Sequence, residues 1–474
     1  MDEIKLSDDV IEQIKDFDKF HLTKEQESLV DKIILNEELR KRYKFFGLCE
    51  ECKQLNTYPY WCQSCNSRYF QQNFKNWTSG NHEVDEFIKK TQLRAKKRVQ
   101  ILEWIEYDKF DDVEYLAKGG FGSTFKADWK DGYILCRDYK NNQWERNGET
   151  KVALKCLHNS QDITAEFLKE VESTILACEF GSGFVVFCFG ITKDPKTNNF
   201  MMVMDLKGRN LRQHLNDDFN SLNWMYKLRI LKNISFGLSD IHNSGLIHRD
   251  FHCGNILSDI GNNAYITDLG LCQPANMKSD NKKIYGVLPY VDPEVLRGKE
   301  YTKESDIYGF GIIAYEICTG LPPYHDIAHD EFLAIKICHG LRPKSNYKIP
   351  QLIFDTINRC WDADLLKRPK ADELQKLFTD IFANWKEDSV IDKQIDEANE
   401  INEKSSSSTV QSPSSSTSDL SYMTHPQAVY TSRLLDFKNL PKPKNADNND
   451  NLLGIEDSES TIIDFTKLDF NSKD

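Results

Sequence analysis

The sequence predicts an α+β fold in which a strand-rich segment precedes a helical one, with smaller segments at both ends. Strand patterns occur at residues 116–125 and 201–204, and a long helical pattern follows at residues 224–244. Two Cys-x-x-Cys pairs precede these patterns, and a Ser-rich stretch follows them. The 474 residues suffice for one large domain and additional small modules.

The composition argues against several classes of protein. A net charge of −13 disfavours binding to nucleic acid or to anionic membranes, because both require a basic surface. The amino terminus is acidic and lacks the apolar core of a signal peptide. The longest apolar run, residues 307–321, is shorter than the roughly 20 residues that span a bilayer, and it contains Glu316. We therefore expect an intracellular, cytoplasmic protein with no membrane partner.

Thirteen cysteines in a chain without a secretion signal are better explained as thiols or metal ligands than as disulfides. Four of them form two pairs, Cys49 with Cys52 and Cys62 with Cys65, separated by nine residues. Four thiolates at this spacing can enclose a structural Zn²⁺ in a module at residues 47–70. A redox function and a chance spacing are the alternatives.

The segments around this module show helical patterns without chemistry of their own. Residues 1–46 contain a helical pattern that begins after Thr23, a good N-cap residue. Residues 84–107 are predicted as a basic helical linker. A basic helix can bind nucleic acid or calmodulin, but a solvated charged face is the commoner explanation, so we expect no nucleic-acid partner.

One stretch near the middle of the chain has the residues that phosphoryl transfer requires. Asp250 follows a His-Arg pair, and Asn255 follows five positions later. A second carboxylate, Asp268, comes after a strand-like run. Asp250 can accept a proton from an attacking hydroxyl, while Asn255 and Asp268 can hold Mg²⁺ against nucleotide phosphates.

These residues resemble the His-Arg-Asp-x-x-x-x-Asn and Asp-Phe-Gly motifs of eukaryotic protein kinases. The resemblance implies a two-lobed protein kinase fold at residues 110–384, with a β-rich N-lobe and a helical C-lobe. It is similar to tyrosine-kinase-like serine/threonine kinases. The cysteine module in front resembles that of a lineage-expanded fungal group.

The same resemblance assigns a nucleotide site. Lys155, in a Val-Ala-Leu-Lys run, corresponds to the lysine that contacts the α- and β-phosphates, and Glu170 to its acidic partner; Glu166 and Glu172 are alternatives in other registers. Met204 corresponds to the gatekeeper residue before the hinge. The complete set of nucleotide-binding residues is Ala117, Lys118, Gly119, Gly120, Phe121, Gly122, Thr124, Ala153, Lys155, Met204, Asp205, Leu206, Lys207, Leu257 and Asp268. Alanine at 117 and threonine at 124 depart from the family's Gly-rich pattern.

Residues 286–294 resemble the end of a kinase activation segment, with Val287 in place of threonine and Asp292 in place of alanine. The resemblance predicts an ion pair between Glu294 and Arg368. It also predicts that Asp306 supports the catalytic loop.

Two residues of this segment, Ser279 and Tyr285, are candidate phosphorylation sites. The resemblance suggests that Arg249 holds such a phosphate.

The resemblance implies an enzyme that transfers the γ-phosphate of Mg·ATP to serine or threonine of protein substrates in signalling, with tyrosine not excluded. Asp250 would orient and deprotonate the acceptor. His252 stands where serine/threonine members carry a lysine near the γ-phosphate, and histidine supplies a full charge only when protonated.

Two other functions are consistent with parts of the sequence. Ala117, His252, Val287 and Asp292 favour a pseudokinase or scaffold that binds ATP without efficient transfer. A zinc-dependent nucleic-acid binder at residues 40–110 is a third possibility. The sequence does not indicate an oligomeric state.

Residues 387–474 are predicted as a disordered, Ser-rich tail. Its most biased part is residues 405–418. Two apolar islands, residues 428–440 and 455–470, are either docking or autoregulatory peptides or parts of an unstructured tail.

Overall fold

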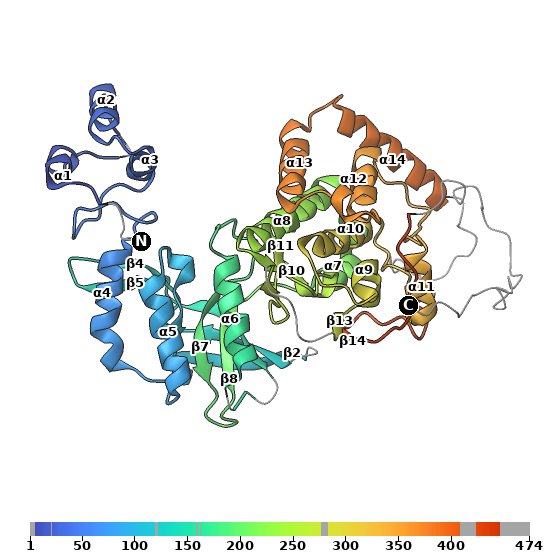
Figure 1. The fold of residues 1–474 in the computed structure, drawn as a ribbon, viewed down its shortest axis with the longest axis horizontal. Coiled ribbons are helices and arrows are strands. Elements are labelled where there is room, and N and C mark those ends of the chain that lie inside the picture. The colour runs from blue at the N-terminus through green and yellow to red at the C-terminus, as the bar shows by residue number, and fades with distance from the viewer. Residues whose placement is uncertain are drawn as a thin grey trace, which may run out of the picture.

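The computed structural model describes residues 5–19, 21–118, 122–157, 160–161, 163–275, 283–407 and 423–445. A group of N-terminal helices leads into a β-sheet, and a larger helical lobe follows the sheet (Figure 1). This arrangement confirms the predicted α+β, two-lobed kinase fold.

The N-terminal helices form a small core of their own. They are α1 (Asp8–Ile14), α2 (Lys24–Ile33) and α3 (Glu37–Phe46). The Thr23 side chain accepts a hydrogen bond from the Gln26 amide, and the Gln26 side chain accepts one from the Thr23 amide. This capping box satisfies two amides at the start of α2. Ile14, Val30 and Tyr43 are buried between the three helices.

The cysteine module continues into α4 (Gln63–Asn73) and α5 (His82–Arg94). The helix predicted for residues 84–107 is therefore wrong beyond Arg94. The physical reason is strand pairing: β1 (Glu103–Trp104) lies parallel to β7 (Cys188–Lys193) and extends the sheet.

The sheet of the N-lobe has six strands in the order β1-β7-β8-β6-β3-β2. The remaining strands are β2 (Phe110–Lys118), β3 (Gly122–Trp129), β6 (Thr150–Leu157) and β8 (Phe200–Asp205). Helices α5 and α6 (Ala165–Ala177) lie beside the sheet (Figure 1). Val84 and Ile88 of α5 are buried in the same apolar cluster as Phe167 and Val171 of α6.

The polar insert after β3 forms an antiparallel hairpin, β4 (Ile134–Asp138) and β5 (Gln143–Arg146). Trp144 of this hairpin stacks on Trp61 of the cysteine module, with ring centroids 5.8 Å apart. Arg137 forms an ion pair of 2.7 Å with Glu51 of the same module. The hairpin therefore attaches the cysteine module to the N-lobe.

The helical lobe surrounds a buried central helix, α10 (Lys303–Thr319). Most of the apolar run at residues 307–321 thus lies in this core helix, and Glu316 within it pairs with Arg212 at 2.9 Å. Among the described residues, no helix is long and apolar enough to cross a membrane. The other helices are α7 (Leu211–Asp218), α8 (Trp224–Asn243), α9 (Pro293–Leu296), α11 (Glu331–Cys338), α12 (Gln351–Cys360), α13 (Ala371–Asn384) and α14 (Val390–Ser407).

The helical lobe also contains six short strands. They are β9 (Leu246–Ile247), β10 (Ile256–Ser258), β11 (Ala264–Ile266), β12 (Gln273–Pro274), β13 (Ile284–Gly286) and β14 (Arg433–Leu435). The pairs are β10 with β11, β9 with β12, and β13 with β14.

The prediction of a disordered tail is wrong for two parts of residues 387–474. Ile391 and Ile395 of α14 are buried in the main core, because they recur at helical spacing on one face. Residues 423–445 lie across the helical lobe, where Leu435 and Leu440 are buried. Residues 408–422 and 446–474 lie outside the described part of the chain, including the island at residues 455–470.

The predicted ion pair between Glu294 and Arg368 is also wrong. Arg368 pairs with Asp292, and both side chains have an exposed fraction of 0%. The Asp292 carboxylate accepts the Glu294 amide at 2.9 Å, so Asp292 caps the start of α9. Glu294 lies inside α9 and pairs with Arg297 at 2.9 Å.

We expect Arg368→Ala to lower the free energy of unfolding by about 3–5 kcal/mol, because it leaves the Asp292 carboxylate buried without its partner. Denaturant unfolding measures this change. Arg359→Ala is the matched control, since Arg359 meets Glu373 at 3.8 Å with both side chains more than half exposed; it should change stability by less than about 0.5 kcal/mol. Equal effects of the two substitutions would contradict the assignment.

Candidate active site

The backbone before Asp250 is held by Asp306 of α10. The Asp306 carboxylate accepts hydrogen bonds from the amides of His248, at 2.8 Å, and Arg249, at 3.0 Å. Arg249 has a φ of 70°, which is costly for a residue with a side chain. His242 of α8 contacts the same carboxylate at 2.9 Å. These contacts keep the strained turn in place and thereby orient Asp250.

Asp250 is buried and keeps one carboxylate oxygen without a hydrogen bond. Its Oδ2 accepts the Asn255 side-chain amide at 3.1 Å, and its backbone carbonyl accepts the same amide at 2.9 Å. Oδ1 has no hydrogen-bond partner within the described residues and lies 3.5 Å from His252 Nε2. Burial alone would raise the pKa of Asp250, but His252 and the hydroxyl of Ser432 outweigh it and lower the pKa to about 2. Asp250 is therefore an ionised carboxylate that can accept a proton.

Lys155 of β6 connects the two lobes through two carboxylates. Its Nζ lies 2.6 Å from Glu170 Oε1 on α6 and 3.0 Å from Asp268 Oδ1. Of the three glutamates considered for this contact, the structure brings Glu170 to Lys155. Burial alone would lower the pKa of Lys155, but the Asp268 and Glu170 carboxylates raise it above its usual value.

Asp268 has a φ of 62°, and Gly270 lies two positions after it. A Cβ at position 270 would lie 2.8 Å from Glu170 Oε2. Glycine at this position therefore allows Glu170 and Asp268 to approach Lys155 together.

The predicted adenine side of the site lies on neighbouring strands. Thr124 pairs with Lys155 between β3 and β6, and Ala153 pairs with Met204 between β6 and β8. Leu257 packs against the apolar cluster that contains Met204. The structure thus brings the predicted pocket residues of β3, β6, β8 and β10 together.

The predicted hinge follows β8. The Asp205 amide donates to the Phe187 carbonyl at 3.0 Å. Lys207 pairs with the Asp205 side chain at 2.7 Å and lies over the Tyr265 ring at 4.1 Å. Leu206 lies between these two residues, in the short connection that follows β8.

The Gly-rich turn is described only at its two edges. Ala117 and Lys118 end β2, and Ala117 does not have a positive φ, so alanine is compatible with this position. A Cβ on Gly122 would lie 2.0 Å from the Cys156 carbonyl oxygen, so this glycine permits the close approach of β3 and β6. Gly119, Gly120 and Phe121 lie outside the described residues.

The oxygen atoms of Asn255 and Asp268 fit a magnesium ion, which prefers carboxylate and carbonyl oxygens. The nitrogen of the Asn255 amide is bound to Asp250, so its oxygen is the atom that can coordinate a cation. When bound, Mg²⁺ would neutralise charge on the nucleotide phosphates.

Comparison with known proteins identifies this arrangement. Residues 111–378, more than half of the chain, match the family described as protein tyrosine and serine/threonine kinase. The chain belongs to this family. This membership implies ATP and Mg²⁺ as cosubstrate and metal.

The names of similar proteins include both serine/threonine and dual-specificity protein kinases. A probable serine/threonine-protein kinase of Dictyostelium discoideum is 29% identical over 266 residues, 56% of this chain and 27% of that protein. A dual specificity protein kinase of the same organism is 29% identical over 296 residues, 62% of this chain and 19% of that protein. A dual serine/threonine and tyrosine protein kinase of Mus musculus is 35% identical over 160 residues, 33% of this chain and 17% of that protein. The matched region thus spans less than a third of each of these relatives.

The kinase also brings one unexpected residue to Asp250. The Ser432 hydroxyl donates to Asp250 Oδ2 at 2.5 Å and lies 3.1 Å from His252 Nε2. The apolar island at residues 428–440 suggested a docking or autoregulatory peptide or part of an unstructured tail, and no sequence signal within it singled out Ser432.

Of the two candidate phosphorylation sites in the activation segment, the structure describes Tyr285 but not Ser279. Tyr285 lies within β13, and its carbonyl accepts the Tyr301 hydroxyl at 2.7 Å. Arg249 donates to the Gln273 side chain at 2.8 Å and lies over the Tyr301 ring at 4.7 Å. Ser279 lies outside the described residues.

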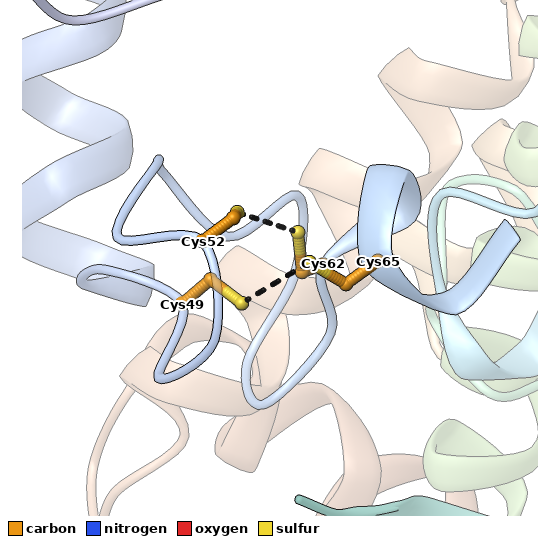
Figure 2. Close-up of side chains that lie close together, drawn as sticks. All are labelled: Cys49, Cys52, Cys62 and Cys65. Atoms are coloured by element: carbon orange, nitrogen blue, oxygen red, sulfur yellow. Dashed lines mark hydrogen bonds between the residues drawn. The ribbon is translucent and has the colours of Figure 1, made fainter. Parts of the chain in front are cut away.

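The four module cysteines converge on one point (Figure 2). Their sulfur atoms all lie within 4.8 Å of one another, with Cys49 and Cys65 3.8 Å apart and Cys52 and Cys62 3.7 Å apart. Sulfurs bound to a tetrahedral Zn²⁺ at about 2.3 Å are separated by about 3.8 Å, so this cluster fits zinc. Arg68 donates to Cys65 Sγ at 3.4 Å, which would offset the negative charge of four thiolates.

Proposed function

We propose that this chain is an ATP-dependent protein kinase that phosphorylates serine or threonine of protein substrates, with tyrosine as a further acceptor. The contact of Lys155 with both Glu170 and Asp268, next to an ionised Asp250, carries this proposal. Serine/threonine and dual-specificity kinases among the relatives support it. The assignment to the tyrosine-kinase-like group and the resemblance of the cysteine module to that of a lineage-expanded fungal group stay predictions.

In the proposed reaction, Asp250 orients the acceptor hydroxyl and accepts its proton. Lys155 binds the α- and β-phosphates in a position fixed by Glu170. Asn255 and Asp268 would hold the magnesium ion. The rate enhancement comes from positioning and electrostatic stabilisation, since the protein forms no covalent bond to the phosphoryl group.

The substitutions that favoured a pseudokinase have structural explanations that are compatible with activity. The Asp292 carboxylate has Arg368 as its partner, and Val287 is buried in the core. The His252 Nε2 atom lies 3.5 Å from Asp250 Oδ1, so this side chain contacts the catalytic carboxylate directly. These observations support phosphoryl transfer over a purely structural role.

We expect Asp250→Asn and Lys155→Ala each to lower phosphate transfer from Mg·ATP to a generic protein substrate by roughly 10²–10⁴-fold, because one removes the proton acceptor and the other the phosphate contact. Lys151→Ala is the matched control, since Lys151 lies on the same strand with its side chain 74% exposed. Transfer is measured as phosphate incorporation, with identification of the acceptor amino acid. Equal incorporation by wild type and Asp250→Asn, with ATP still bound, would favour the scaffold.

We also propose that Cys49, Cys52, Cys62 and Cys65 bind one structural zinc ion. Three of these cysteines are buried, and four thiolates complete the coordination of a tetrahedral Zn²⁺, as in structural rather than catalytic sites. The Tyr139 hydroxyl lies 3.7 Å from the Cys49 sulfur, so the β4–β5 hairpin borders the proposed metal. Zinc would therefore stabilise the contact between the module and the N-lobe.

Elemental analysis of the purified protein should find about one zinc per chain. Cys52→Ser should lose most of this metal and expose the module to proteolysis, because a tetrahedral site loses one of four ligands. Cys136→Ser, a substitution on the neighbouring hairpin outside the cluster, should retain the metal. A folded wild-type protein without metal would exclude the zinc site.

A further inference from the structure

The segment at residues 423–445 occupies the face of the helical lobe on which Asp250 lies. Its strand β14 pairs antiparallel with β13 of the activation segment, and both strands lie at one edge of the helical lobe (Figure 1). The register places Leu434 opposite Tyr285 and Arg433 opposite Gly286. When a peptide adds a strand to a sheet, hydrogen bonds between backbone groups hold it in place, and these bonds do not depend on the identity of its side chains.

Side-chain contacts hold the segment on both sides of this strand. Before it, the Tyr430 ring lies 4.2 Å from the Arg212 guanidinium and 4.9 Å from the His329 ring. The Tyr430 hydroxyl donates to the Pro323 carbonyl at 3.0 Å. After it, Leu435 is 4% exposed. Tyr430 and Leu435 therefore fix the segment on either side of the residues nearest Asp250.

Ser432 lies between these anchors and has the hydrogen-bond geometry of a phosphoryl acceptor. The His252 Nδ1 atom accepts the Gly254 amide at 3.0 Å, so the ring proton of a neutral His252 is on Nε2. Nε2 then donates to Ser432 Oγ, at 3.1 Å, and the hydroxyl proton of Ser432 points to Asp250 Oδ2, at 2.5 Å. This arrangement directs the proton to the carboxylate that would remove it.

The two neighbouring hydroxyl groups do not have this geometry. The Tyr430 hydroxyl is bound to the Pro323 carbonyl, and Thr431 is exposed. The contacts thus select one hydroxyl of the segment.

We propose that residues 423–445 are an intramolecular substrate and that Ser432 is phosphorylated by the active site of its own chain. The inference rests on the kinase activity proposed above. Ser432 Oγ forms a bond to the γ-phosphorus of ATP while the bond from that phosphorus to the β–γ bridging oxygen breaks. ADP leaves with the electron pair of that bond, and the hydroxyl proton passes to Asp250 and then to solvent.

Phosphorylation also changes the stability of the docked segment. A phosphoserine carries a charge of about −1.5 to −2, and here it would face the Asp250 carboxylate in a buried site. Repulsion and desolvation oppose that arrangement. Before the reaction the segment excludes other protein substrates, and after it the segment leaves the active site.

The test uses the full chain incubated with Mg·ATP, followed by mass spectrometry of the peptide that contains Ser432. We expect phosphate on Ser432 in the wild type and in Thr431→Ala, and none in Asp250→Asn. The rate constant should be constant within about twofold over a tenfold range of protein concentration, because the acceptor is tethered. A rate constant that rises in proportion to concentration would overturn the intramolecular step.

A generic protein substrate in the same reaction separates the two proposals. Phosphorylation of that substrate without phosphate on Ser432 overturns this inference and leaves the kinase activity intact. No phosphate on either acceptor shows that the proposed function itself has failed, and this inference fails with it.

Amide hydrogen exchange tests the release. Amides of residues 433–435 should exchange at least about tenfold faster after phosphorylation, because β14 no longer pairs with β13. The Ser432→Ala chain, treated identically, should keep its protection. Unchanged protection in a protein phosphorylated at Ser432 would overturn the release.

Discussion

The active site depends on a single buried carboxylate at its back. Asp306 accepts two consecutive backbone amides, of His248 and Arg249, and thereby stabilises a turn with a positive φ at Arg249. Such a conformation persists only where the surroundings over-determine it. Because α10 is buried along its length, Asp306 is itself fixed, and the rigidity of the core is transmitted to Asp250. Asn255 then completes the loop by bonding both to the backbone and to the side chain of Asp250.

The N-terminal segments contact the N-lobe, which carries Lys155 and Glu170. Helix α6 carries Glu170, and Phe167 of α6 is buried in the same apolar cluster as Ile88 of α5. Helix α5 follows the cysteine module, and the Trp61 indole donates to the Ala95 carbonyl at 2.9 Å just after α5, so the module is attached to the end of this helix. The β4–β5 hairpin adds a second connection through Trp144. The module is thus joined to the N-lobe at two places, the end of α5 and the β4–β5 hairpin.

The motifs allowed the two-lobed fold and the kinase family to be predicted, because catalysis by positioning requires a fixed order of a few polar residues. The partner of Arg368, the end of one helix and the ordered parts of the tail could not be predicted from motifs, because they depend on tertiary contacts. Asp292 and Glu294 lie two positions apart and both carry a carboxylate, and only the geometry of the α9 cap decides that Asp292 binds Arg368. The helix predicted for residues 84–107 ends early because residues 103–104 pair with strand β7, which is distant in the sequence. The tail was predicted to be disordered from its average composition, which does not reveal that a few apolar residues, such as Ile391 and Leu435, are buried against the helical lobe.

The strand register explains how so short a segment can select one acceptor. Side chains of a strand alternate between its faces, so a shift of one residue would turn Leu435 from the core toward solvent. The loss of its burial, worth roughly 1.5–3 kcal/mol, opposes the shift. The same shift would bring Thr431 or Arg433 to Asp250, and the ring of Tyr430 would lose its place beside Arg212. Residues that never touch the reacting atoms therefore determine which hydroxyl faces the catalytic carboxylate, and β13 supplies the template for that choice.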